Sequence, residues 1–226
     1  TAVIWSFQKN PSTKCGKRNT VNDSYLQLVI IFSNTITHRL HYIADFIGTQ
    51  IIGESITVTS NRTDFKVFTG LKINYSNDQI AEADFWIQPH SLLFETTIQQ
   101  QTITCFEINN YKAFFKTKGD FPFDIFAASF YLLSRYEEYL PHKKDMYGRY
   151  AHENSIAFKE NFLNLPLVNI WIQHFKELLK QKFPESRLIT PDFRLILTYD
   201  IDEAYSYKYK KWWRSAGAAI KGLFKG

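Results

Sequence analysis

The chain has 226 residues, 45% hydrophobic and 17% aromatic, so it can bury the core of one large domain, or of one domain and part of a second. This composition excludes an intrinsically disordered chain, and 20 Phe and 13 Tyr beside a single Met predict a core built from aromatic rings. The net charge of +5 gathers at the ends of the chain, because six cations and no acid follow Glu203. A mildly acidic body between basic ends argues against a nucleic-acid-binding domain, which carries a basic stripe on its folded surface.

The lack of a recognisable sorting signal and the use of cysteine both predict a cytoplasmic location. No apolar run approaches the ~20 residues that cross a bilayer, and the start of the chain lacks the apolar region of a secretory signal. Cys15 and Cys105 are the only cysteines, and they form neither a CxxC pair nor a zinc-ligand spacing. The sequence therefore predicts a cytoplasmic protein with two reduced thiols.

The first part of the chain predicts a series of strands around one helix. Residues 1–26 are polar and lack periodicity, which predicts a loose N-terminal extension. Apolar residues on one face predict a helix over Thr37–Ile47 that stops at Gly48. Apolar runs and alternation predict five strands: Leu26–Phe32, Ile51–Thr59, Phe65–Phe68, Leu71–Tyr75 and Ala83–Ile87.

A hairpin and two long helices follow. Ile103–Ile108 and Tyr111–Phe115 predict the hairpin, which turns at Asn109-Asn110 because Asn tolerates positive φ. Amphipathic patterns predict helices over Asp124–Tyr139 and Pro166–Phe183, with a polar loop over 142–154 between them. This order of elements predicts an α/β fold, or an α+β one, with a mixed sheet and flanking helices over 27–185. A new unit is expected to begin near residue 190.

Two carboxylates mark the start of that unit. Phe193–Leu197 predicts a buried strand, and Asp200 and Asp202 follow at its carboxyl end on the same side of the strand. Ligands bind at this edge of open α/β sheets. The pair fits a metal-dependent hydrolase, a phosphatase of the haloacid-dehalogenase kind, or a nucleotide-sugar transferase whose D-x-D motif holds a divalent ion. The alternative is a pair of solvated acids at a strand end.

The stretch Thr198–Asp202 resembles the first motif of the polysaccharide deacetylases, the NodB-homology carbohydrate esterases, in its D-x-D form. The preceding part of the chain is similar to a domain of unknown function that precedes the deacetylase domain in some bacterial proteins. That similarity lies in three segments: Phe121–Phe126, Ser134–Pro141 and Asp145–Arg149. The resemblance covers about 27–210, and it implies that 190–226 begins a (β/α) deacetylase barrel that is truncated in this chain.

The resemblance gives the two acids different roles. Asp200 matches the general base that deprotonates the metal-bound water, and Asp202 matches a carboxylate ligand of a divalent metal, usually zinc. The family also needs two His ligands from a later motif, but no His follows His174. A catalytic zinc takes three protein ligands and an open position, so this chain is expected to hold zinc poorly and to lack activity alone.

The complete protein is expected to remove N-acetyl groups from a sugar polymer or precursor, so its expected partner is an N-acetylated carbohydrate. The competing expectation is a non-catalytic domain that binds a glycan or a partner, or that positions a catalytic unit. The basic, aromatic stretch 208–226 has the composition of a helix that lies on a membrane surface. The favoured interpretation of that stretch is the first helix or loop of the following domain.

Other polar residues give weaker candidates. His38 and His41 are three residues apart on the first predicted helix, where they can share a face as metal ligands. Two further groups fit a sugar, a carboxylate or a pocket lining: Arg135, Glu137 and Glu138 on the long helix, and Asp145, Arg149, His152 and Glu153 in the polar loop. An ordinary exposed surface is the favoured interpretation of each of these groups.

Overall fold

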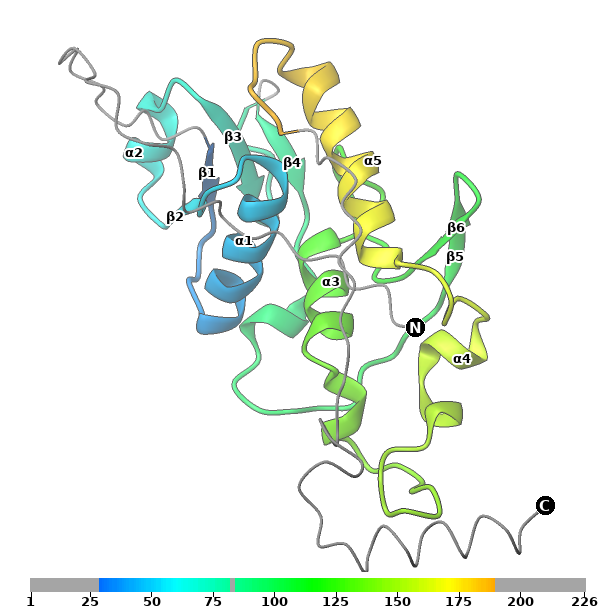
Figure 1. Cartoon of the computed structure of the whole chain (residues 1–226). Coiled ribbons are helices and arrows are strands. Elements are labelled where there is room, and N and C mark those ends of the chain that lie inside the picture. The colour runs from blue at the N-terminus through cyan, green and yellow to red at the C-terminus, as the bar shows by residue number, and fades with distance from the viewer. Residues whose placement is uncertain (1–28, 82–83, 190–226) are drawn as a thin grey trace, which may run out of the picture. The chain divides into compact units, whose positions relative to one another are not determined.

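The computed structural model of the chain describes residues 29–81 and 84–189, drawn in colour in Figure 1. Three expectations lie outside these residues: the extension over 1–26, the strand that leads to Asp200 and Asp202, and the basic stretch 208–226. Within the described residues, no helix combines the length and the apolar character that crossing a membrane requires.

A parallel sheet lies at the centre of the described unit. Its four strands are β1 (Val29–Phe32), β2 (Thr57–Thr59), β3 (Leu71–Tyr75) and β4 (Phe85–Ile87), in the order β2-β1-β3-β4. Each neighbouring pair is parallel. The chain leaves β1 through helix α1 (His38–Ile51) to reach β2, and it returns through helix α2 (Arg62–Val67) to reach β3 on the other side of β1. The connections therefore reverse direction between β1 and β3.

The predicted α/β class with flanking helices is confirmed, and the predicted hairpin is present as a separate antiparallel sheet. It pairs β5 (Phe106–Ile108) with β6 (Tyr111–Ala113). Parallel and antiparallel strands thus belong to two sheets, and not to the one mixed sheet that the sequence predicts. Asn109 and Asn110 have φ values of 44° and 66°, which confirms the predicted turn with positive φ at both positions.

Helices cover both faces of the parallel sheet (Figure 1). Val29 and Ile31 belong to the main core, which includes residues of α1, α3 (Ile125–Leu133) and α5 (Leu167–Lys182). The alternate residues Ile30 and Phe32 pack with Phe65 of α2 on the opposite face. Aromatic rings form most of the largest fully buried side chains, as the composition predicts: Trp171, Tyr75, Phe65, Phe85, Phe114, Phe121, Phe123, Phe126 and Phe175.

Helix α1 starts where the sequence predicts but ends four residues later. The Thr37 side chain caps the helix by accepting from the Leu40 N–H. Gly48 does not end the helix. The absence of a side chain there allows the backbone after the helix to pack closely against it. A Cβ at Gly48 would lie 2.6 Å from the Glu54 carbonyl oxygen. The extension of α1 to Ile51 also confines β2 to the last part of its predicted strand.

The prediction of a strand over Phe65–Phe68 is wrong, because these residues lie mostly in helix α2. Asn61 caps that helix by accepting from the backbone N–H groups of Thr63 and Asp64. Only Phe65 of this short helix is buried. One buried ring gives no periodicity, so the cap is the only strong signal in the sequence.

The predicted helix over Asp124–Tyr139 is divided into two elements. Helix α3 ends at Leu133, Arg135 takes left-handed backbone angles (φ 53°, ψ 43°), and a 3₁₀ helix η2 follows over Tyr136–Tyr139. The remaining elements are the 3₁₀ helices η1 (Ser91–Phe94) and η3 (His152–Asn154) and the single turn α4 (Ile156–Lys159). The second long helix is confirmed as α5.

The segment 118–120 covers the outer edge of β4. The Gln88 N–H donates to the Lys118 carbonyl (2.9 Å), and the Asp120 N–H donates to the Trp86 carbonyl (2.7 Å). Gly119 lies between these two bonds with a φ of 128°, and a Cβ there would overlap the Trp86 carbonyl oxygen. This position therefore requires glycine both for its backbone angles and for the close contact.

We predict that Gly119→Ala lowers the free energy of unfolding by at least about 2 kcal/mol, since it combines unfavourable backbone angles with overlap against β4. Gly148 provides the matched control. It also has positive φ (78°), but a Cβ there meets nothing within 4 Å. Gly148→Ala should cost only about 1 kcal/mol. Urea denaturation of both variants measures the difference, and equal losses would contradict the role given to 118–120.

Candidate functional site

A polar crevice opens at the carboxyl edge of the sheet, between β1 and β3. It encloses about 120 Å³ and is lined by residues 33–35 after β1, residues 75–77 at the end of β3, and Pro89 and Phe94. β1 and β3 are the strands between which the connections reverse direction. In open α/β sheets, ligands bind at this topological switch point. Position alone therefore makes the crevice the first candidate for a binding site.

Buried polar side chains fix the backbone on the β3 side of the crevice. Ser76 Oγ lies 2.6 Å from Asn74 Oδ1 and 2.9 Å from the Asp78 carbonyl oxygen, which also accepts from Asn74 Nδ2 (2.8 Å). The Trp86 indole N–H donates to the Ser76 carbonyl (2.9 Å). Asn74 and Ser76 are buried, so these bonds replace the water that their polar atoms have lost. The turn after β3 is held in one conformation as a result.

Helix α1 holds the other wall of the crevice. The Thr37 hydroxyl donates to the Leu93 carbonyl (2.6 Å), and the Arg39 guanidinium donates to the carbonyls of Leu92 (2.7 Å) and Thr97 (2.9 Å). The same guanidinium lies over the rings of Phe130 and Tyr136, 5.7 and 5.6 Å from their centres. These contacts fasten the segment that carries Phe94 to α1.

A buried carboxylate, Asp124, connects the crevice to the core. Its Oδ2 accepts from the Tyr75 hydroxyl (2.6 Å) and the His90 N–H (2.7 Å), and its Oδ1 accepts from the Ala127 N–H (3.0 Å) at the start of α3. Burial raises the pKa of Asp124 to about 6, although these donors oppose the shift. Burial and the Asp124 charge also hold the pKa of Tyr75 well above its ordinary value. Tyr75 therefore stays protonated and acts as a donor.

His90 begins the segment that follows β4. Its ring stacks on Phe115, with centres 3.9 Å apart and planes 16° apart, and its Nδ1 accepts from the Leu92 N–H (3.3 Å). Burial lowers the pKa of His90, so the imidazole is neutral at neutral pH. An accepting Nδ1 places the remaining proton on Nε2. His90 thus helps to shape the loop after β4 as a neutral ring.

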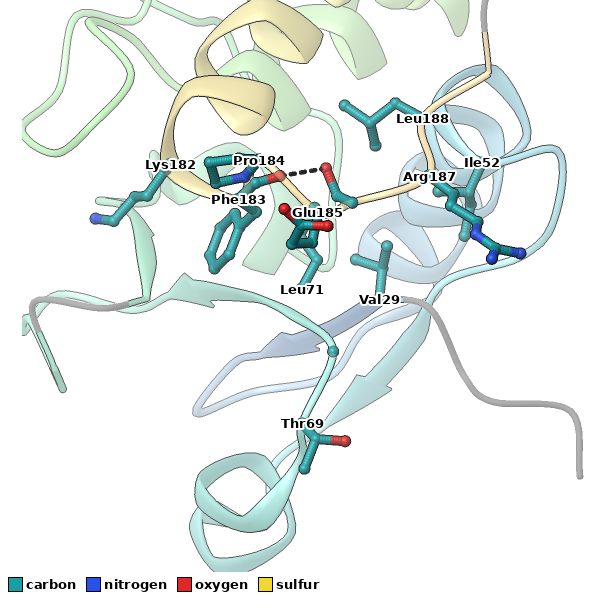
Figure 2. A pocket seen from close by; sticks show the side chains of 12 residues that line it. Val29, Ile52, Thr69, Leu71, Lys182, Phe183, Pro184, Glu185, Arg187 and Leu188 are labelled. Atoms are coloured by element: carbon teal, nitrogen blue, oxygen red, sulfur yellow. Dashed lines mark hydrogen bonds between the residues drawn. The ribbon is translucent and has the colours of Figure 1, made fainter.

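A larger cavity, of about 620 Å³, opens at the opposite, amino edge of the sheet (Figure 2). Val29 and Leu71 from the starts of β1 and β3 line it together with Ile52, Phe183 and Leu188. The turn after α5 closes one side, where the Ser186 hydroxyl donates to the Phe183 carbonyl (2.7 Å). Ligand sites of open α/β sheets lie at the carboxyl edge, so the smaller crevice is the better candidate.

Residues 29–184 match a family of unknown function, DUF7033. The chain belongs to this family. No curated protein and no solved structure matches the chain. The DUF7033 match confirms the part of the sequence resemblance that concerns a domain of unknown function, and the deacetylase part remains a proposal.

The DUF7033 domain places its predicted metal-site candidates on an exposed part of helix α1. His38 and His41 are both exposed on α1. Within 29–81 and 84–189, no three His, Cys, Asp or Glu side chains converge where they can hold a metal ion. Burial, assisted by the Glu160 charge, raises the pKa of the Cys105 thiol to about 11, so that thiol is protonated and unreactive at neutral pH. Asp200, Asp202 and Cys15 lie outside the described residues.

The polar residues predicted around α3 form separate local pairs. Arg135 and Glu138 make an exposed ion pair, whereas Glu137 accepts from the Ile156 N–H (2.8 Å), and burial raises the pKa of Glu137. In the polar loop, Arg149 pairs with Asp145 (3.3 Å) and His152 lies 3.5 Å from Glu153. Asp145 also accepts from the N–H groups of Tyr147 and Arg149, which closes a tight turn. These pairs organise the surface, and none of them lines the crevice.

Sequence reasoning missed the crevice of the DUF7033 domain. The available signal was a run of hydroxyl and amide residues directly after two predicted strands: Ser33-Asn34-Thr35 and Ser76-Asn77. Parallel strands end at the same edge of a sheet, so these runs meet if the strands are parallel neighbours. That neighbour relation depends on the strand order, which the sequence pattern does not contain.

We predict that Tyr75→Phe destabilises the DUF7033 domain more at alkaline than at acidic pH. The pKa of Asp124 is raised by folding, so its stabilising contribution is present at low pH and is lost as the pH rises through about 6. Loss of the Tyr75 donor should cost about 2–3 kcal/mol near pH 8, where the carboxylate is ionised, and about 1 kcal/mol near pH 5.

Urea denaturation at the two pH values measures this difference. Tyr42→Phe is the matched control, because Tyr42 is half exposed and contacts Phe130 only with its ring. A loss for Tyr75→Phe that is the same at both pH values would contradict the coupling to Asp124.

Proposed function

We propose that the DUF7033 domain is the non-catalytic domain of a metal-dependent carbohydrate deacetylase, whose catalytic unit begins near residue 190. The complete protein removes N-acetyl groups from a sugar polymer or precursor. The observation that carries this proposal is the deacetylase-like D-x-D motif, Thr198–Asp202, which follows the residues that match DUF7033 in the same chain.

The described residues support this division of the chain. The family match ends at 184, just after the last helix, α5, ends at Lys182. The chain then crosses back to α1, where the Ile189 N–H donates to the Ile51 carbonyl (2.8 Å). The strand expected over Phe193–Leu197 comes after this point in the sequence.

In this proposal the two acids divide the chemistry between them. Asp200 takes the proton from the attacking water, and Asp202 contributes one ligand to a divalent metal ion, which would be zinc in the related esterases. One carboxylate is not a zinc site, because such a site takes three protein ligands and an open position. The proposal therefore requires two His ligands from a motif downstream of Asp202.

The second candidate is a binding domain that belongs to no deacetylase. The polar crevice at the switch point favours a binding role for the DUF7033 domain under either proposal. The two differ outside this domain, because only the deacetylase requires an H-x-x-x-H-type motif downstream of Asp202.

We predict that the complete protein, loaded with zinc, releases acetate from an N-acetylglucosamine oligomer, and that the 226-residue chain does not. Asp200→Asn should lower kcat about 100-fold or more, as expected for loss of a general base. Asp202→Asn should lower the zinc content of the purified protein. Enzymatic acetate detection and metal analysis measure these two effects.

The exposed acid Asp45 on α1 provides a control, since Asp45→Asn changes the same charge away from both acids in sequence and should leave acetate release unchanged. Robust acetate release by the 226-residue chain would contradict the proposal. Unchanged activity in both the Asp200→Asn and Asp202→Asn proteins would contradict it as well.

A further inference from the structure

We propose that the crevice between β1 and β3 is a binding site for one neutral sugar residue of a glycan. The choice of a carbohydrate rests on the proposed function, whereas the place and the polarity of the site rest on the described residues. The site supplies recognition and no chemistry, because its lining consists of amide, hydroxyl and apolar groups.

Two asparagine amides are available to a ligand in the crevice. Asn34 after β1 and Asn77 after β3 both line it, and both are exposed. Neither side chain makes a hydrogen bond within the described residues, in contrast to the buried Asn74. An amide offers one acceptor and two donors, which suits the hydroxyl groups of a sugar because each of these both donates and accepts.

The crevice also has an apolar wall. Phe94 lines it and stacks on Tyr75, with ring centres 6.0 Å apart and planes 29° apart, and Pro89 lies beside them. A sugar ring has C–H groups on one face and hydroxyl groups at its rim. An apolar surface facing polar side chains matches that distribution, as is general for small-molecule sites.

The lining favours a neutral ligand over a phosphate or a nucleotide. Among the described residues that line the crevice, none is charged. The nearby cation Arg39 is engaged by two carbonyl groups and by Glu95 at 4.0 Å. The loop from β1 to α1 reads Ser-Asn-Thr-Ile-Thr, without the glycines that let a dinucleotide pyrophosphate approach the backbone. The volume of about 120 Å³ lies below the range of about 300–1,000 Å³ that is usual for small-molecule sites, so the crevice is too small to enclose a whole nucleotide.

The walls are held in place before any ligand arrives. Ser76 and Trp86 fix the turn that carries Asn77, and Thr37 and Arg39 fix the segment that carries Phe94. A site that is already ordered loses less conformational entropy on binding. This allows a small site to bind a sugar residue with weak but measurable affinity.

Titration of the 226-residue chain, observed by ¹H–¹⁵N NMR, tests the proposal. The probes are an N-acetylglucosamine tetramer, a glucose tetramer and inorganic phosphate. We expect millimolar binding of at least one tetramer, with shifts of the Asn34 and Asn77 side-chain amides. Asn34→Ala and Asn77→Ala should each weaken binding about threefold to tenfold, the effect of one neutral hydrogen bond. Asn169→Ala, at an exposed asparagine on α5, should leave binding unchanged.

Absence of shifts at Asn34 and Asn77 with both tetramers would overturn the proposal, and so would binding of phosphate at these residues in place of sugar. Equal binding by wild type, Asn34→Ala and Asn77→Ala would place the sugar elsewhere. The two proposals fail separately. Acetate release by the complete protein without sugar binding at the crevice removes only this inference, and sugar binding without acetate release removes only the deacetylase.

Discussion

The arrangement around the candidate site depends on one buried carboxylate. Asp124 is fully buried, yet it joins the end of β3 through Tyr75, the segment after β4 through His90, and the start of α3 through Ala127. A buried carboxylate without partners would cost several kcal/mol, and three donors offset most of that cost. The offset is incomplete, because the pKa of Asp124 stays raised, at about 6. Asp124 thus holds the end of β3, the segment after β4 and the start of α3 together.

The crevice is a consequence of this junction. Tyr75 lines the crevice and also donates to Asp124, so the position of its ring is set from the core side. Phe94 stacks on that ring, and Thr37 and Arg39 tie its segment to α1. The exposed amides of Asn34 and Asn77 are therefore presented by rigid strand ends. Loops that project freely from a surface would hold two such groups at a less constant separation.

Patterns that act over a few residues could be predicted from the sequence, and contacts between distant segments could not. The β1 and β3 strands, helices α1 and α5, and the Asn109-Asn110 turn follow from periodicity and turn chemistry. Helix α2 gives no periodic signal because only Phe65 faces the core. Gly48 resembles a helix stop in the sequence, although its role is to leave room for the Glu54 carbonyl, where the chain turns back after α1. The crevice depends on β1 and β3 being neighbours, and that follows from packing. Asp200 and Asp202 were predicted from a motif, and they lie outside the described residues.

Taken together, the two proposals imply that one polymer substrate binds at two places, the crevice and the catalytic unit. A catalytic unit that cleaves one N-acetyl bond gains little from tight binding of a single residue, since binding that is equal in the ground and transition states does not raise kcat. A separate weak site in the same chain acts differently. It holds another residue of the same polymer, so that the catalytic encounter becomes intramolecular and is governed by an effective concentration. A neutral crevice for one sugar residue in the DUF7033 domain, followed by a unit with the base and a metal ligand, fits this division of labour. In such an arrangement the crevice affects reaction on long polymers more than reaction on a single sugar, because only a polymer reaches both sites.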